Sequence, residues 1–311
     1  MINAVGRDIP DYLLTNGREV YQGKNYKDGQ KVKKATPTTV RHEKPQEDKL
    51  CATIREACDK CGAHDGMTFS SQTGVGGPSL AVNRFLENHM REKGIKMSFA
   101  LGGTSSAICA LQDKGLVDYI LDTQDFDQGA AAHLFSNPHH IEIDLSEYAN
   151  AGNKGAYVNK LDYVVLSALE IDTKFNVNVI TGSDGVLRGA PGGHPDTAAG
   201  SKCCIIVTPL TRGRMATVCK DVVTVTTPGD CVDVLVTDYG IAVNPARPDL
   251  IECLDKAGIK HVSIEWLQQK AYDLVGEPDP LQWEDKVVAI VEARDGTILD
   301  VVRQVKPYSF D

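Results

Sequence analysis

The sequence predicts an α/β fold with a mainly parallel sheet flanked by helices. From Met67 onward, short apolar runs alternate with segments of helical periodicity, which is typical of parallel strands joined and covered by helices. Two of the runs, residues 163–171 and 204–207, are almost continuously apolar. Strands buried on both faces of a sheet have this composition, whereas half-exposed strands alternate polar and apolar residues.

The expected elements follow one another in a regular order. Apolar runs predict strands at residues 67–72, 96–101, 119–123, 163–171 and 204–207. Apolar residues at helical spacing predict helices at residues 82–90, 108–114, 249–257 and 263–275. A glycine, the residue that commonly ends a helix, follows each of them: Gly94, Gly115, Gly258 and Gly276. Runs at 287–293 and 298–305 flank an Asp295-Gly296 turn and predict a closing hairpin.

Three regions of the chain differ in composition and periodicity. Residues 1–46 contain Gly, Pro, Lys and Thr without a sustained period and predict an extended N-terminal arm. Residues 47–65 predict a short helix and a linker, because Leu50, Ile54 and Cys58 recur at a spacing of four. Residues 66–311 then form the expected α/β domain.

Composition excludes several classes of protein. The net charge is −9 over 311 residues, which gives no electrostatic reason to bind nucleic acid or an anionic membrane. No apolar run is long enough for a signal peptide or a membrane span. Nine cysteines, most of them in apolar runs, suit a reducing compartment, so we expect a cytoplasmic protein. Cys58 and Cys61 form an isolated CxxC without a second pair, and we expect no metal site.

The first candidate site is a glycine-rich loop. Gly74, Val75, Gly76 and Gly77 follow the first predicted strand, and Pro78 stands at the first position of the next helix. Glycines let backbone N–H groups approach a ligand, and a helix that begins there adds free donors. The loop suits a phosphate, a carboxylate or a thioester oxyanion. A tight turn without a ligand explains it equally well.

The second candidate is the Gly/Pro-rich stretch at residues 189–196, between two predicted buried strands. Loops at strand ends of α/β sheets commonly bind ligands. His194 suits an acid–base or hydrogen-bonding role there, or a structural role in the loop. Asp196 has the alternative role of capping the following helix.

Carboxylates end the strand predicted at 163–171. Glu170 and Asp172 fall on one face by alternation, where they must meet a cleft or a partner charge. Arg212, after a later strand, suits carboxylate or phosphate recognition, although loop arginines are common. None of these features identifies a substrate.

Several motifs together resemble citrate lyase α chains, and the resemblance covers nearly the whole sequence. The most specific run is SALEID at 167–172, followed by FNVNVITGSDG at 175–185 and GGHPDTAAG at 192–200. Other matching segments are GRDIP at 6–10, QTGVGG at 72–77, SFALGG at 98–103, NKLD at 159–162, residues 236–248 and DVVRQVK at 300–306.

The resemblance implies a CoA-transferase-like fold, a superfold of related α/β halves. It implies that citrate displaces acetate from an acetyl thioester on the acyl carrier (γ) subunit, giving citryl carrier. The β subunit then cleaves citryl carrier to oxaloacetate and acetyl carrier. The expected partners are therefore the β and γ subunits, citrate and the acetyl thioester. No cofactor is bound directly, since the thiol belongs to the CoA-like prosthetic group of the carrier.

The resemblance also assigns roles to residues. The loop Gly74, Val75, Gly76 and Gly77 matches a thioester-binding loop, with the N–H groups of Gly76 and Gly77 as oxyanion donors. Asn178 matches an asparagine near the thioester, and Glu170 is expected to orient substrate groups. Gly192 and Gly193 match a glycine pair lining the cleft, joined there by His194 and Asp196.

One difference concerns the nucleophile. Related transferases carry a nucleophilic glutamate soon after the strand matched by residues 96–101. Here Gly102, Gly103 and Thr104 follow, which favours direct transfer between bound substrates over a covalent glutamyl thioester.

A second difference concerns length. Residues 1–68 resemble the family's beginning, whereas Phe69 onward resembles the start of its second transferase half. Most of the first half is therefore expected to be missing. The alternative function is a non-catalytic assembly module that binds the other subunits. A homo-oligomer is expected. A sugar-phosphate isomerase or deaminase on a similar fold is a third reading, which no phosphate-binding motif supports.

Overall fold

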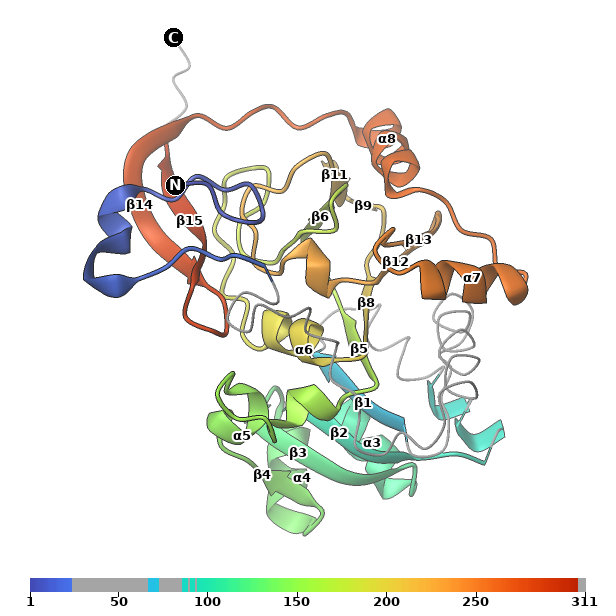
Figure 1. Ribbon diagram of the computed structural model, residues 1–311. Helices are drawn as coiled ribbons and strands as arrows, with labels where there is room; N and C mark the ends of the chain where they lie inside the picture. The colour runs from blue at the N-terminus through green and yellow to red at the C-terminus, as the bar shows by residue number, and fades with distance from the viewer. Residues whose placement is uncertain (24–66, 73–85, 89, 93, 307–311) are drawn as a thin grey trace.

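A single eight-stranded sheet forms the centre of the molecule (Figure 1). The computed structural model describes residues 1–23, 67–72, 86–88, 90–92 and 94–306. All neighbouring strands of the sheet are parallel except β12 and β13. The predicted mainly parallel sheet is thus confirmed. In spatial order the strands are β13 (Gly240–Val243), β12 (Val234–Thr237), β8 (Cys203–Val207), β5 (Tyr163–Leu166), β1 (Met67–Gln72), β2 (Met97–Thr104), β3 (Val117–Asp125) and β4 (His140–Glu142).

The central strands are apolar throughout because both of their faces are covered. Tyr163 and Val165 of β5 pack into one core with α3 (Ser106–Asp113) and α7 (Pro248–Lys256). Val164 and Leu166 of the same strand pack into a second core with α8 (Ile264–Val275). Alternate residues of one strand therefore serve opposite cores, which explains the unbroken apolar runs.

The helices predicted at 108–114, 249–257 and 263–275 are confirmed as α3, α7 and α8. Gly115, Gly258 and Gly276 follow them with φ of +73°, +69° and +87°. This left-handed conformation favours glycine and ends a helix. Two helices that the sequence analysis did not predict are α4 (Gln128–Ser136) and α5 (Leu145–Ala149).

The strand predicted at 163–171 is wrong in one respect, because it is divided. β5 ends at Leu166, and β6 (Glu170–Asp172) begins a separate sheet with β7 (Val177–Asn178) and β11 (Val218–Cys219). The connecting residues leave the ladder because side chains bind their carbonyls. His194 Nε2 lies 2.8 Å from the Ser167 oxygen, and Arg212 Nη2 donates to the Ala168 oxygen at 2.8 Å. Arg212 is thus engaged with the backbone.

The predicted closing hairpin is confirmed as β14 (Trp283–Glu292) and β15 (Ile298–Val305). Figure 1 shows the N-terminal segment, residues 1–23, lying beside this hairpin. Val20 forms a parallel bridge with Ile298, and the apolar side chains of Ile9 and Val20 pack against Ile298 and Val301. Part of the predicted arm therefore covers the hairpin. The helix predicted within 47–65 lies outside the described residues.

The shorter elements complete the described chain. They are the 3-10 helices η1 (Asp11–Gly17), η3 (Tyr157–Lys160) and η4 (Gly229–Cys231), the helix α6 (His194–Gly200), and the strand pair β9 (Thr211–Arg212) and β10 (Met215–Ala216). In the part of the chain that the structure describes, every helix is too short or too polar to cross a membrane.

Candidate functional site

A cleft of about 800 Å³ opens at the carboxyl edge of the main sheet. Its lining comes from the ends of β2 and β3, from the residue after β5, from α5 and from the start of α6. Ligands of α/β proteins bind at this edge, where the loops leave the strands. Five residues predicted from the sequence meet here: Gly103, Gly192, Gly193, His194 and Asp196.

Glycines shape two walls of the cleft. A Cβ on Gly103 would lie 2.2 Å from the Phe126 ring, so the missing side chain lets the ring close against the end of β2. Gly192 has a φ of +55°, which is strained for other residues. Gly102 is buried with a φ of +112° but does not line the cleft.

His194 holds the start of α6 against the end of β5. Its Nε2 lies 2.8 Å from the Ser167 carbonyl oxygen, which can only accept, so Nε2 carries the hydrogen. Its Nδ1 then accepts from the Thr227 hydroxyl at 2.8 Å. Burial lowers the pKa of His194 to about 4. The imidazole is therefore neutral near pH 7, and both ring nitrogens are occupied.

Among the described residues that line the cleft, Asp196 and Arg294 are the charged ones. Burial raises the pKa of Asp196 to about 6, and the positive charge of Arg294 opposes that rise. The alternative that Asp196 caps the following helix is wrong, because α6 begins at His194 with Gly193 as its N-cap residue.

Arg294 is the residue that sequence reasoning missed. It follows β14, at the tip of the closing hairpin, and its Nη1 donates to Asn159 Oδ1 at 3.2 Å. Burial lowers the pKa of the guanidinium, and its Nε is buried without a hydrogen-bond partner among the described residues. A guanidinium that lines a cleft suits an anionic ligand such as a carboxylate. Only its place before the Asp295-Gly296 turn marks it in the sequence.

Glu170 and Asn178 form a separate buried cluster outside the cleft lining. Glu170 Oε1 accepts from the Ser183 N–H at 2.6 Å, and Asn178 Nδ2 donates to Glu170 Oε2 at 3.5 Å. Asn178 Oδ1 accepts the N–H groups of Ile180 and Thr181 at 3.0 and 3.1 Å. Both side chains thus hold the turn at residues 180–183, which follows the cleft residue Val179.

The sequence predicts that Glu170 and Asp172 face a cleft or a partner charge. In the structure, both carboxylates instead accept hydrogen bonds from backbone and amide groups. Asp172 Oδ1 accepts the N–H groups of Lys174 and Asn176, at 2.9 and 3.0 Å. Backbone and amide donors satisfy both carboxylates, and burial is the largest influence raising each pKa.

Gly74, Val75, Gly76 and Gly77 lie outside the described residues. β1, which precedes them, ends at Gln72 between β5 and β2.

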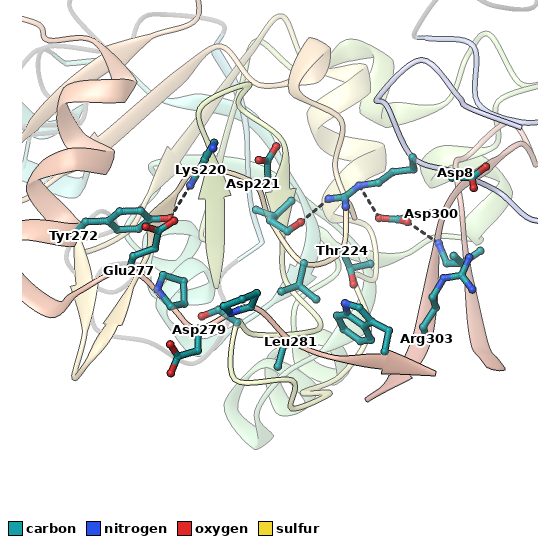
Figure 2. A pocket seen from close by; sticks show the side chains of 18 residues that line it. Asp8, Lys220, Asp221, Thr224, Tyr272, Glu277, Asp279, Leu281, Asp300 and Arg303 are labelled. Atoms are coloured by element: carbon teal, nitrogen blue, oxygen red, sulfur yellow. Dashed lines mark hydrogen bonds and ion pairs between the residues drawn. The ribbon is translucent and has the colours of Figure 1, made fainter. Parts of the chain in front are cut away.

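A second hollow of about 500 Å³ lies between the hairpin, α8 and the N-terminal segment (Figure 2). The Arg7 guanidinium lies 3.2 Å from Asp300. Figure 2 shows the Tyr272 hydroxyl, which accepts a hydrogen bond from the Lys220 backbone. Acidic residues outnumber basic ones here by five to three. Of the predicted site residues that the structure describes, none lines this hollow. The cleft beside α6 is therefore the candidate site.

Comparison with known proteins gives consistent matches. A family model described as citrate lyase, alpha subunit, matches residues 24–305. Citrate lyase alpha chains from Escherichia coli K12 and Klebsiella pneumoniae are 61% and 58% identical over 238 residues, which is 76% of this chain and 47% of each relative. The chain thus spans about half the length of these curated relatives.

Two solved structures also match this chain, one of them from the same family. A crystal structure described as the α subunit of citrate lyase in complex with citrate, from Streptococcus mutans, superposes with a TM-score of 0.76 at 48% identity. The match covers 89% of this chain and 54% of that one. A Pseudomonas malonate decarboxylase hetero-tetramer, at 14% identity and a TM-score of 0.50 over 74% of this chain and 49% of that one, shares the fold alone.

Proposed function

Because the chain belongs to the citrate lyase α-subunit family, we propose that it carries out citrate CoA-transfer. In this reaction citrate and acetyl-acyl carrier protein give citryl-acyl carrier protein and acetate. The observation that supports it is the cleft in which Gly103, Gly192 and Gly193 meet the half-buried cation Arg294. Citrate is a tricarboxylate, and a half-buried guanidinium recognises carboxylates by paired hydrogen bonds.

The transfer needs positioning and charge stabilisation. A citrate carboxylate oxygen attacks the acetyl thioester carbonyl, and the carbon–sulfur bond breaks. The carrier thiolate then attacks the citryl carbonyl of the resulting anhydride and releases acetate. Arg294 would hold a citrate carboxylate that does not react. Gly192 and Gly193 would let the thioester approach the backbone closely.

The oxyanion of each step needs hydrogen-bond donors. We assign that role to the N–H groups of Gly76 and Gly77, with Gly74 and Val75 in the same loop, on the family resemblance. The preceding strand β1 ends at the edge where the cleft opens. The contacts described above make Asn178, Glu170 and His194 positioning residues of the cleft wall.

The wider context belongs to the same proposal. The fold would be the CoA-transferase-like superfold, with residues 66–311 as its domain behind an arm at 1–46 and a linker at 47–65. The partners would be the β subunit and the acyl carrier subunit, in the cytoplasm. The thiol would come from the carrier's prosthetic group, without a directly bound cofactor. A second copy of the chain is the expected source of any site residue that one copy lacks.

Citrate-dependent acetate release from an acetyl-acyl carrier subunit of a relative tests the proposal. Arg294→Gln should raise the KM for citrate by roughly 10- to 100-fold, the loss expected for a charge-assisted hydrogen bond of about 1.5–3 kcal/mol. Arg294→Lys keeps the charge and should lose less. Arg303→Gln, on the same hairpin but outside the cleft lining, is the matched control.

Two results of these measurements would count against the proposal. An unchanged citrate KM in Arg294→Gln would remove Arg294 from substrate binding. No acetate release from a cooperatively folded chain that still binds the carrier subunit would favour the non-catalytic assembly module.

A further inference from the structure

A compact group of metal-ligating side chains lies behind the cleft wall. Asp122 and Asp125 come from the carboxyl end of β3, and His140 begins the neighbouring strand β4. Asp122 and His140 are only 2% and 3% exposed. One ligand atom from each of the three residues lies within 4.8 Å of the others.

Two atoms of this group are buried without a hydrogen bond among the described residues: His140 Nε2 and Asp125 Oδ1. The nearest ion-pair contact of His140 Nε2 is Asp122 Oδ2, at 3.4 Å. The ion pairs found among the described residues bring no lysine or arginine to Asp122 or Asp125. Buried carboxylates normally have a balancing cation and full hydrogen bonding. The ion pair found for this group among the described residues is with His140, which balances the carboxylates only when its ring is protonated.

The contact between His133 and His140 determines whether His140 Nε2 carries a hydrogen or a free lone pair. His133 Nδ1 and His140 Nδ1 are 2.9 Å apart, so one must donate to the other. His133 Nε2 contacts both Asp113 Oδ1 at 3.3 Å and Asn137 Nδ2 at 3.2 Å. If Asn137 donates, the relay ends with a hydrogen on His140 Nε2. If His133 Nε2 donates to Asp113, His140 Nδ1 donates to His133, and Nε2 has a free lone pair.

We propose that Asp122, Asp125 and His140 bind a divalent transition-metal ion of the zinc class. A tetrahedral ion with bonds of about 2.1 Å separates its ligands by roughly 3.4 Å. That is the separation of His140 Nε2 and Asp122 Oδ2. The nitrogen ligand favours Zn²⁺ over Mg²⁺ or Ca²⁺, which prefer oxygen. The Asp113–His133–His140 relay then acts as the outer shell that fixes the ligand tautomer.

A rival ligand set shares the same histidine. Cys109, His133 and His140 also have ligand atoms within 4.8 Å of one another. An ion between the histidines would have to break the 2.9 Å contact of their Nδ1 atoms. The other set could bind an ion through His140 Nε2 and Asp125 Oδ1 without breaking a hydrogen bond at either atom. The geometry therefore favours the carboxylate set.

The ion would stabilise the end of β3, which forms part of the cleft wall. Thr123 and Gln124 lie between the two aspartates in the sequence, and Phe126 follows them. All three line the cleft. A cation that holds both aspartates and β4 would fix this end of β3 and hence the cleft wall. The inference departs from the sequence-based expectation of no metal, and it does not depend on the proposed transferase activity.

Metal content of the purified full-length chain tests the proposal. After removal of metal with a chelator and dialysis against Zn²⁺, the wild-type chain should hold one equivalent of zinc that Asp125→Asn and His140→Gln lack. Asp118→Asn, half-exposed on the same strand, and His139→Gln, exposed next to His140, are matched controls and should keep it. Zinc held by Cys58 and Cys61 would remain in all variants. His133→Gln should weaken binding by roughly 10- to 100-fold.

Wild-type chain that retains no zinc would overturn the proposal, whatever the variants do. Equal zinc in the wild type and in a cooperatively folded Asp125→Asn would overturn it as well. Dialysis against Mg²⁺ alone should leave the site without metal. Co²⁺ as a spectroscopic probe should show no thiolate-to-metal charge transfer from this site, and a band abolished by Cys109→Ser would assign the metal to the rival set.

Discussion

His194 shows how burial changes the role of a residue type. A histidine in a Gly/Pro-rich loop suggests acid–base chemistry, because its usual pKa lies near neutrality. In the structure both ring nitrogens are bonded within the protein, to Ser167 and Thr227. Desolvation lowers the pKa to about 4. The residue therefore positions the start of α6, and the remaining candidate for contact with an anionic substrate is Arg294.

Stability should depend on the protonation of His194. Its pKa falls from 6.5 to about 4 on folding, so its contribution is complete above pH 6.5 and is lost as pH falls through 4. The loss is on the order of 3 kcal/mol. Denaturant unfolding between pH 7 and 4 measures it.

His194→Gln should show a flatter fall in unfolding free energy over this range, whereas the exposed-residue control His139→Gln should follow the wild type. Parallel curves for His194→Gln and the wild type would contradict the assigned tautomer and burial.

At the scale of elements, α6 is held by the close approach of its last turn to η3. A Cβ on Gly200 would lie 2.5 Å from the Val158 carbonyl oxygen. That atom belongs to the backbone and cannot rotate away. The absence of a side chain at Gly200 therefore sets the separation of the two elements, and with it the position of the cleft residues at the other end of α6.

Gly200→Ala should lower the free energy of unfolding by about 1–3 kcal/mol, the usual cost of overpacking a buried contact. Gly152→Ala is the control, since its Cβ would meet only the Asn150 side-chain oxygen at 3.3 Å. Urea unfolding of both variants measures the difference. Equal stability of the two variants would mean that α6 and η3 separate at little cost.

At the scale of the whole molecule, the two ends of the described chain stabilise each other. Arg7 Nε lies 3.2 Å from Asp300 Oδ2, and the Val225 N–H donates to the same oxygen at 2.7 Å. The Asp300 side chain is only 5% exposed. Asn3 Nδ2 also donates to the Leu299 carbonyl at 2.7 Å. The N-terminal segment thus neutralises a carboxylate buried in the closing hairpin.

Arg7→Ala should destabilise the fold by on the order of 3 kcal/mol, because it leaves the buried Asp300 carboxylate without its cation. Arg18→Ala breaks the pair with Glu292, whose side chains are 45% and 46% exposed. That change should cost less than about 1 kcal/mol. Thermal unfolding compares the two, and equal shifts would show that the N-terminal segment contributes little through Arg7.

The sequence by itself determined the elements whose signals are local and the family to which they belong. β8, α7, α8 and the hairpin are marked by apolar periodicity and by a glycine or a turn at their ends. The cluster of Gly103, Gly192, Gly193, His194 and Asp196 was also found from the sequence, through motifs of the family. Such signals depend on neighbouring residues and on shared ancestry.

Only the tertiary structure decided which of these side chains meet a cleft and which are used within the fold. It ended β5 at Leu166, because side chains from distant segments bind the next carbonyls. It turned Glu170 and Asn178 inward onto N–H donors, and it brought Arg294 from the hairpin to Asp196. These outcomes depend on contacts between residues far apart in the chain, and periodicity does not encode such contacts.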